Sequence, residues 1–341
     1  MISVARPSGW RGKKPAKAGF FVSGVQEMQG TPESAPLRTR VYIDGYNFYY
    51  GCLKGTPYKW LDMLQLFESQ ILPSVLVKDL HDQTRRSELV ESPSILFFTA
   101  KILESVAKSV DSVSSQARYH TALRKLYSGR IELIEGYYAV NRIKVKIVDA
   151  ELPNRQPREC QELLAWKVEE KQSDVNLALH AYHDAITDQI DQAVIVTNDT
   201  DIAPALQMIR THTNTLIGLV VPTTNQQRHP NTDLVKFAHW TRHHINLNEL
   251  ATCQLPRVIP GKHPTVKPNS WYAQPDLLIK IVDQAIQVRG SRSAAFKWLE
   301  QPNDYLGGKR PIELAETIEG AHEVLEYIRS WVTQNIPQKN E

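Results

Sequence analysis

Two aspartates follow a short apolar run in the middle of the chain, and their spacing suits metal-ion chemistry. Residues 194–204 read VIVTNDTDIAP, with Asp199 and Asp201 directly after the run. The β-branched run predicts a buried parallel strand, and Pro204 predicts the start of a helix. Open α/β sheets place their sites at the carboxyl ends of their strands. Taken alone, the stretch fits equally well if one acid caps the helix and the other is solvated.

Two further acids occupy comparable positions elsewhere in the chain. Residues 40–50 read RVYIDGYNFYY, a short apolar strand that ends at Asp44, and Asp174 opens a segment with helical spacing. Each acid alone is explained by a turn or a helix cap. Together, acids at strand ends and at a helix start can converge on one edge of a sheet. Their mutual repulsion then calls for a divalent cation, and oxygen ligands suit Mg²⁺ or Mn²⁺.

These stretches resemble the NYN family in its LabA-like form, a branch of the PIN-like nucleases. Three family motifs recur in order: Asp-x-x-Asn, a Lys-Gly-x-Asp helix start, and Ser-Gly-Asp-Ser-Asp-Phe. The matching residues are Asp44 and Asn47; Lys171 and Asp174, with Gln172 in place of Gly; and Thr197, Asn198, Asp199, Thr200, Asp201 and Ile202. The resemblance covers residues 38–250. It implies an α/β class, a PIN-like, Rossmannoid three-layer domain with a central, mostly parallel sheet.

The resemblance also implies a metal-dependent endoribonuclease that takes single-stranded or looped RNA. The implied catalytic residues are Asp44, Asp174, Asp199, Asp201 and Asn47, and the four acids among them would hold Mg²⁺ or Mn²⁺. Other implied roles are support of the acidic turn by Thr197 and Asn198, and substrate contact by Tyr46, Lys171 and Arg228. Many relatives carry further acids where this chain has His180 and His239, which argues against a tight second metal site. The alternative is a non-catalytic RNA-binding adaptor.

The last 69 residues have a helical pattern of their own. Residues 273–341 predict a small all-α bundle, which is small for a stand-alone enzyme. Its pattern of Trp298, Leu299, the Gly307–Gly308 pair and Pro311 is similar to the toxin-binding domain of the Xre/MbcA/ParS antitoxins. That resemblance implies a protein-interaction module that binds a RES-type toxin, as in a toxin–antitoxin, RNA-processing or phage-defence setting. Self-association through the same bundle is an equally open interpretation, and so is a toxin-binding, antitoxin-like protein.

Composition bounds the remaining possibilities. Residues 1–40 hold seven basic and two acidic residues, a net charge of +5, and since the whole chain carries +3 the remainder carries −2. Nucleic-acid binding would therefore depend on local patches. The three cysteines show neither metal-ligand spacing nor a disulfide framework, which fits a reducing cytoplasm. We expect no membrane segment, because no run approaches the ~18 apolar residues required.

Domain limits follow from the same reading. We expect a disordered tail at 1–37, the NYN domain at 38–250, a Pro-rich linker at 251–272 and the helical module at 273–341. Within the NYN domain, residues 131–134 predict a strand and 149–165 a loop. Residues 137–148 alternate apolar and polar side chains, which predicts a half-exposed strand or hairpin arm. Arg142, Lys144 and Lys146 share one side of it, as either a phosphate-binding edge or a solvated face.

Overall fold

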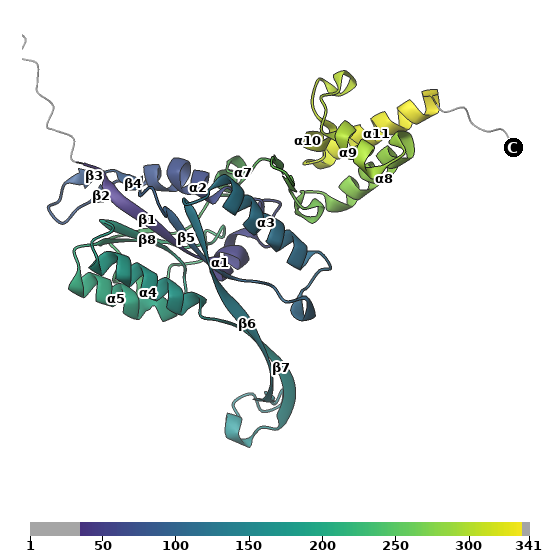
Figure 1. The fold of residues 1–341 in the computed structure, drawn as a ribbon. Coiled ribbons are helices and arrows are strands. Elements are labelled where there is room, and N and C mark those ends of the chain that lie inside the picture. Colours follow the sequence, from purple (N-terminus) through teal and green to yellow (C-terminus); the bar gives the residue numbers. More distant parts are fainter. Residues whose placement is uncertain (1–34, 336–341) are drawn as a thin grey trace, which may run out of the picture. The chain divides into compact units, whose positions relative to one another are not determined.

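The structure is a computed structural model that describes residues 35–335. The expected N-terminal tail at 1–37 lies almost wholly outside the described residues. The described chain is mixed α/β, as expected, with helices gathered at its C-terminal end (Figure 1). No helix within residues 35–335 is both long and apolar enough to cross a membrane.

A single mostly parallel sheet organises the α/β domain. Its strand order is β10-β9-β8-β1-β5-β6-β7, and β4 pairs with the start of β1. The strands are β1 (Leu37–Asp44), β4 (Ser87–Leu89), β5 (Ile95–Ala100), β6 (Ile131–Lys146), β7 (Glu162–Lys171), β8 (Gln192–Val196), β9 (Leu216–Val220) and β10 (Trp240–Arg242). Every pair in this sheet is parallel except β6 with β7. The central strands β1, β5 and β8 are buried along almost their whole length, as their continuous apolar runs predict.

Helical segments cover both faces of the sheet. The α-helices are α1 (Gly45–Phe48), α2 (Met63–Gln65), α3 (Ser112–Leu126), α4 (Ser173–Ile186), α5 (Ala203–His212), α6 (Thr232–Val235) and α7 (Leu247–Thr252). Alternate residues of β1 point to opposite faces. Val41 and Ile43 therefore lie in a buried cluster with residues of α2 and α3, and Tyr42 lies in a second cluster with residues of α4 and α5. This arrangement confirms the predicted three-layer fold.

Strand β6 differs from the two separate segments that the sequence predicts. It runs unbroken through Ile131–Lys146, pairing with β5 over residues 131–136 and with β7 over 137–146. A Cβ at Gly136 would lie 2.3 Å from the carbonyl oxygen of Lys171, so only glycine permits the close approach where the strand changes partner. The expected loop at 149–165 is shorter than predicted, because β7 already begins at Glu162.

The segment at 251–272, expected to be a Pro-rich linker, also contains regular structure. It contains a two-stranded hairpin, β11 (Val258–Ile259) with β12 (Thr265–Val266). Ile259 is buried in the core of the α/β domain, and the Trp271 ring lies 5.7 Å from that of Tyr119 in α3. Apolar side chains set among the prolines of this segment therefore pack against the sheet domain.

The C-terminal module is all-helical, as predicted. Its α-helices are α8 (Pro275–Arg289), α9 (Arg292–Leu299), α10 (Pro311–Leu314) and α11 (Ile318–Asn335). They share one buried core that includes Leu278, Leu299, Ile312 and Val324. Gly290 ends α8 in the left-handed conformation, with φ 79°, and Ser291 caps the next helix.

Candidate active site

Asp44 stands at the carboxyl end of the central strand. It is the last residue of β1, caps α1, and is only 2% exposed. Its Oδ1 accepts a hydrogen bond from the Asn47 backbone N–H at 2.9 Å. Its Oδ2 accepts from the Asn47 side-chain amide at 2.7 Å and from the Thr197 hydroxyl at 2.8 Å. Burial nevertheless raises the pKa of Asp44, because it outweighs these donors, and the nearby Asp199 carboxylate adds to the rise.

The turn after β8 brings two more acids beside Asp44. β8 pairs in parallel with β1, and Val196 lies opposite Ile43. Thr197, the residue after β8, therefore lies beside Asp44, the last residue of β1. The Thr197 hydroxyl also accepts from the Asp199 backbone N–H at 3.1 Å, so this one side chain joins the two turns. Asp199 Oδ1 accepts from the Asp201 N–H at 3.0 Å, which fixes the acidic turn.

Helix α4 contributes the fourth predicted acid. Asp174 lies in its first turn and is half-buried. Burial raises the pKa of Asp174 to about 6, and the carboxylates of Asp44, Asp199, Glu170 and Asp201 add to that rise in this order. Carboxylates influence one another this way only at short range. The structure thus brings the four predicted acids into one electrostatic neighbourhood.

Glu170 belongs to the same neighbourhood and is absent from the predicted set. It lies near the end of β7, opposite Tyr138 of β6. Its carboxylate accepts hydrogen bonds from the Ser173 hydroxyl and, at 3.5 Å, from the Tyr138 hydroxyl. Burial raises the pKa of Glu170 despite the Ser173 donor, and Asp44 adds to the effect. The sequence shows only that Glu170 lies four residues before Asp174, which does not reveal the direction of its side chain.

The remaining predicted residues have varied surroundings. Asn198 accepts from the Asn231 N–H at 2.8 Å and so anchors the loop before α6. Lys171 is paired with Glu169 at 2.9 Å, on the opposite face of the strand from Glu170. The positive charge of Arg228 acts on the buried Cys52, whose thiol pKa burial raises to about 12. Tyr46 is 47% exposed.

The two histidines that replace acids of many relatives make structural contacts. The His180 ring lies 5.8 Å from the Phe98 ring. His239 Nδ1 accepts from the Ile217 N–H at 2.8 Å, which ties the start of β10 to β9. Burial lowers the pKa of His239 to about 4, so this side chain is neutral at pH 7.

The acids do not form a ready-made metal cage. Within the described part of the chain, no three His, Cys, Asp or Glu side chains are gathered so that they could hold an ion as they stand. The donor chemistry nevertheless fits a hard divalent cation, because every candidate ligand is a carboxylate oxygen. Burial is the main reason for the raised pKa of Asp174, and the neighbouring carboxylates add a repulsion that a bound cation would relieve.

Comparison with known proteins places this site in a family. The 6-hydroxy-3-succinoylpyridine 3-monooxygenase HspA of Pseudomonas putida (strain DSM 28022 / S16) is 73% identical over 307 residues, which is 90% of this chain and 98% of that protein. The chain belongs to the HspA family. It also matches the family model of the NYN domain over residues 99–243 and that of the antitoxin Xre/MbcA/ParS C-terminal toxin-binding domain over residues 284–331.

These matches confirm the fusion that the sequence predicts. The NYN match includes Asp174, Asp199 and Asp201, whereas Asp44 precedes it. A solved protein of unknown function from Vibrio parahaemolyticus RIMD 2210633 has a TM-score of 0.34 and 13% identity, covering 64% of this chain and 98% of its own, too distant for any conclusion. The name of HspA describes a monooxygenase, so family membership does not by itself make the chain a ribonuclease.

Proposed function

We propose that this member of the HspA family is a metal-dependent ribonuclease that hydrolyses RNA phosphodiester bonds. The observation that carries the proposal is the grouping of carboxylates around Asp174. Burial raises the pKa of Asp174 to about 6, and four acids from β1, β7 and the turn after β8 add to the rise. Such grouping of repelling charges at the carboxyl edge of a parallel sheet is costly for stability, which argues for a site kept for function.

Each side chain has a definite part in this proposal. Asp44, Asp174, Asp199 and Asp201 would hold Mg²⁺ or Mn²⁺, which when bound supplies charge neutralisation and an acidified water for phosphodiester hydrolysis. Asn47 and Thr197 orient the Asp44 carboxylate through their hydrogen bonds. Glu170 adds a further negative oxygen, and as an acid of raised pKa it is suited to exchange a proton near the reacting phosphate.

Cleavage of a fluorescently labelled RNA by the full chain tests the proposal. We expect cleavage with Mn²⁺, none with EDTA, and a loss of at least about a hundredfold in Asp199→Asn. Asp233→Asn is the matched control, because Asp233 is an exposed acid on α6 that pairs with Lys236. Cleavage that ignores both the chelator and Asp199→Asn would reject the metal mechanism. RNA binding without cleavage would favour the adaptor.

The relative supports a second candidate, oxidation of a hydroxylated pyridine. Identity of 73% across nearly the whole of HspA is a specific reason to test 6-hydroxy-3-succinoylpyridine as a substrate. A monooxygenase needs dioxygen and an electron donor. The turn after β1 does not resemble a dinucleotide site, since it presents the buried Asp44 carboxylate in place of a glycine-rich phosphate cradle.

The two candidates are separated by assaying one preparation in both ways. Consumption of 6-hydroxy-3-succinoylpyridine would be followed together with oxygen uptake, using NADH and added flavin. Under the nuclease proposal, neither quantity rises above that of a heat-treated sample, while RNA is cut. Substrate-dependent oxygen uptake that persists in Asp199→Asn, in a preparation that leaves RNA intact, would establish the second candidate and reject the first.

We also propose a protein partner for the helical module, either a RES-type toxin or a second copy of the chain. The match to a toxin-binding domain supports a protein interface. Tyr305, which is 85% exposed, stacks on the partly buried Tyr327, which in turn stacks on the partly buried Trp298. An exposed aromatic side chain such as Tyr305 is typical of binding surfaces. Analytical ultracentrifugation of the parent and Tyr305→Ala tests self-association, and co-purification with a RES-domain toxin tests the other partner.

A further inference from the structure

Residues 137–171 form a two-stranded arm that begins at the acids. Beyond Gly136, β6 leaves β5 and pairs with β7 alone, from Tyr137–Lys171 to Lys146–Glu162. Figure 1 shows the two strands continuing past the rest of the sheet. Glu170, at the base of the arm, accepts a hydrogen bond from the hydroxyl of Ser173, the residue that precedes Asp174 at the start of α4. Whatever binds along the arm therefore reaches the candidate active site.

The register of the arm defines which side chains share a face. Directly opposed residues of an antiparallel pair point to the same side, and alternate residues to opposite sides. The face that includes Glu170 is called the track face, and its opposed pairs are Tyr138 with Glu170, Val140 with Val168, Arg142 with Trp166, Lys144 with Leu164 and Lys146 with Glu162. Five of the eight charged residues of the paired strands lie on this face, whereas Lys167, Glu169 and Lys171 lie on the other face.

The middle of the track face presents an aromatic ring beside an unpaired cation. Trp166 is 63% exposed, and the Arg142 guanidinium lies 4.8 Å from its ring centroid. Among the described residues Arg142 has no carboxylate partner, while Lys144 and Lys146 share Glu162 at 3.6 and 3.0 Å. Arg142 is four residues along β6 from Tyr138, on the order of 13 Å, so the pair lies about two extended nucleotides from the acids.

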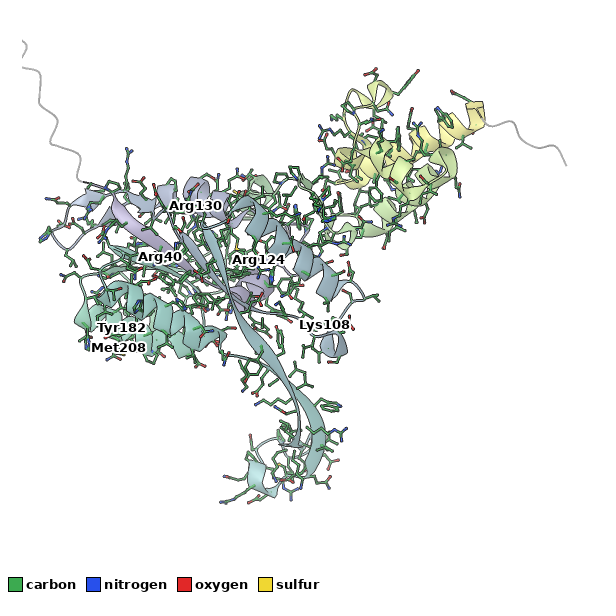
Figure 2. All side chains as sticks on the ribbon, in the orientation of Figure 1. Arg40, Lys108, Arg124, Arg130, Tyr182 and Met208 are labelled. Atoms are coloured by element: carbon green, nitrogen blue, oxygen red, sulfur yellow. The ribbon has the colours of Figure 1, made fainter. Side chains whose placement is uncertain are left out.

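A second aromatic and cationic group lies at the base of the arm. The exposed rings of Tyr46 and Tyr50 are 4.5 Å apart, and the amines of Lys54 and Lys108 lie 4.7 and 5.9 Å from the Tyr50 centroid. Figure 2 labels Lys108, which precedes α3. Neither lysine is paired with a carboxylate in the part of the chain described. Tyr138 connects this group to the arm. Burial raises the pKa of the Tyr138 phenol, and Glu170 of the arm and Tyr50 and Tyr46 of this group add to the rise.

We infer that these two groups are the halves of one binding track for single-stranded RNA, with the acids between them. This inference rests on the proposed function, whose substrate it specifies. Exposed rings stack on bases, and cations without carboxylate partners are available to phosphates. Stacking requires unpaired bases, because a duplex hides their faces and A-form RNA offers side chains mainly its backbone. An RNA strand whose bases stack on Trp166 and Tyr50 brings its phosphate backbone past the carboxylates.

Binding of a fluorescein-labelled 12-nucleotide oligouridine to the full chain tests the track without cleavage, because EDTA removes divalent ions. We expect Trp166→Ala to weaken the affinity about tenfold and to leave its salt dependence unchanged, since stacking releases no counterions. Arg142→Ala should weaken binding and lower the slope of log K against log salt by about 0.7, the value for one phosphate contact with a single strand. Tyr50→Ala should resemble Trp166→Ala.

Matched controls come from the other face of the same arm. Leu163→Ala and Lys167→Ala remove an exposed apolar and a cationic side chain there, and we expect oligouridine binding within twofold of the parent. Equal affinity for the oligouridine and a 12-base-pair RNA duplex, or parent-like binding by both Trp166→Ala and Arg142→Ala, would overturn the track. A parent that dimerises while Trp166→Ala is monomeric would assign the face to a second copy instead.

The outcome can be separated from that of the nuclease proposal. Cleavage that is lost in Asp199→Asn but untouched in Trp166→Ala and Arg142→Ala, with unchanged affinity, would retain the nuclease and reject the track. Single-strand binding that depends on Trp166 and Arg142 in a chain that never cuts RNA would retain the track and reject the nuclease.

Discussion

Asn47 binds Asp44 twice, through its backbone N–H to Oδ1 and through its side-chain amide to Oδ2. The two residues thus form a closed unit at the end of β1, in which the Asp44 carboxylate is held in one orientation. With the Thr197 hydroxyl added, three donors face a carboxylate that is 2% exposed. A charged form so deeply buried needs such donors, and each of them lowers its pKa.

We therefore expect Asn47→Ala to weaken divalent-ion binding and any cleavage by about 10- to 100-fold, the usual effect of losing a residue that orients a metal ligand. The backbone donor survives the substitution, so folding should be little affected. Titration of Mn²⁺ by calorimetry measures the change, with Asn248→Ala on the exposed side of α7 as the control. Unaltered Mn²⁺ affinity in Asn47→Ala would show that Asp44 is not a ligand.

The raised pKa of Asp174 makes stability depend on pH when no divalent ion is present. The pKa is about 6 in the folded protein against an ordinary value of 3.8. Between these values the folded state binds more protons than the unfolded state, so the contribution of Asp174 to stability is largest at low pH and falls as pH rises through 6. Because the side chain is half-exposed to screening solvent, we expect a loss on the order of 1 kcal/mol.

Urea unfolding in EDTA at pH 5 and pH 7 measures this loss. The parent should lose more stability between pH 5 and pH 7 than Asp174→Asn does, because the variant has no titrating group at position 174. The contributions of the other titrating groups are common to both proteins and cancel in the difference. Mn²⁺ should restore stability at pH 7 more in the parent than in Asp174→Asn. Identical pH dependence in the two proteins would mean that Asp174 titrates normally and that the acids do not interact as inferred.

Gln172 occupies a backbone conformation that favours glycine, which the related motif has at this position. Its φ is 78°, in the left-handed region, at the cap of the helix that carries Asp174. A side chain in this conformation destabilises the folded state by about 1 kcal/mol. Glycine avoids that strain, but part of the gain is lost because glycine has more conformational freedom in the unfolded chain. We expect Gln172→Gly to raise stability by about 0.5 kcal/mol and Gln172→Ala to give no gain. Thermal unfolding of both would decide, and a gain shared by Gln172→Ala would implicate the side chain instead.

The central sheet and the acids on it were predictable because both are local patterns. β1, β5 and β8 are continuous apolar runs, and Asp44 and Asp199 follow β1 and β8 within a few residues, so strand ends and acids are read from the same short windows. The position of Asp174 at a helix start is likewise local. Parallel pairing of β1 with β8 then brings the turns together without any further information from the sequence.

Glu170 and the arm depend on pairing that no short window reveals. In the sequence, Glu169 and Glu170 are adjacent acids, and no local pattern distinguishes one from the other. Only the register with Tyr138, across an intervening loop, turns Glu170 toward the site and Glu169 away from it. Likewise, residues 131–134 and 137–148 appear as separate strands because their burial differs, although one backbone runs through both.

A buried ion pair beneath the site provides a stability test of the scaffold. Asp184 of α4 accepts hydrogen bonds from Arg40 and from the Tyr42 hydroxyl of β1, both at 2.6 Å (Figure 2 labels Arg40). Both charged side chains are almost fully buried. Asp184→Ala would leave the Arg40 guanidinium without its counter-charge, and we expect a loss of about 3–5 kcal/mol.

The neighbouring surface pair offers the matched comparison. Asp188 pairs with Arg38 at 3.2 Å but its side chain is 91% exposed, so Asp188→Ala should cost less than about 1 kcal/mol. Urea unfolding of both variants gives the two free energies. The double substitution Arg40→Met with Asp184→Leu should recover much of the loss, because it removes the uncompensated charge together with its partner. Equal costs for Asp184→Ala and Asp188→Ala would mean that α4 is not anchored to β1 through this pair, and that Asp174 owes its position to the packing of Leu177 and Ala181 alone.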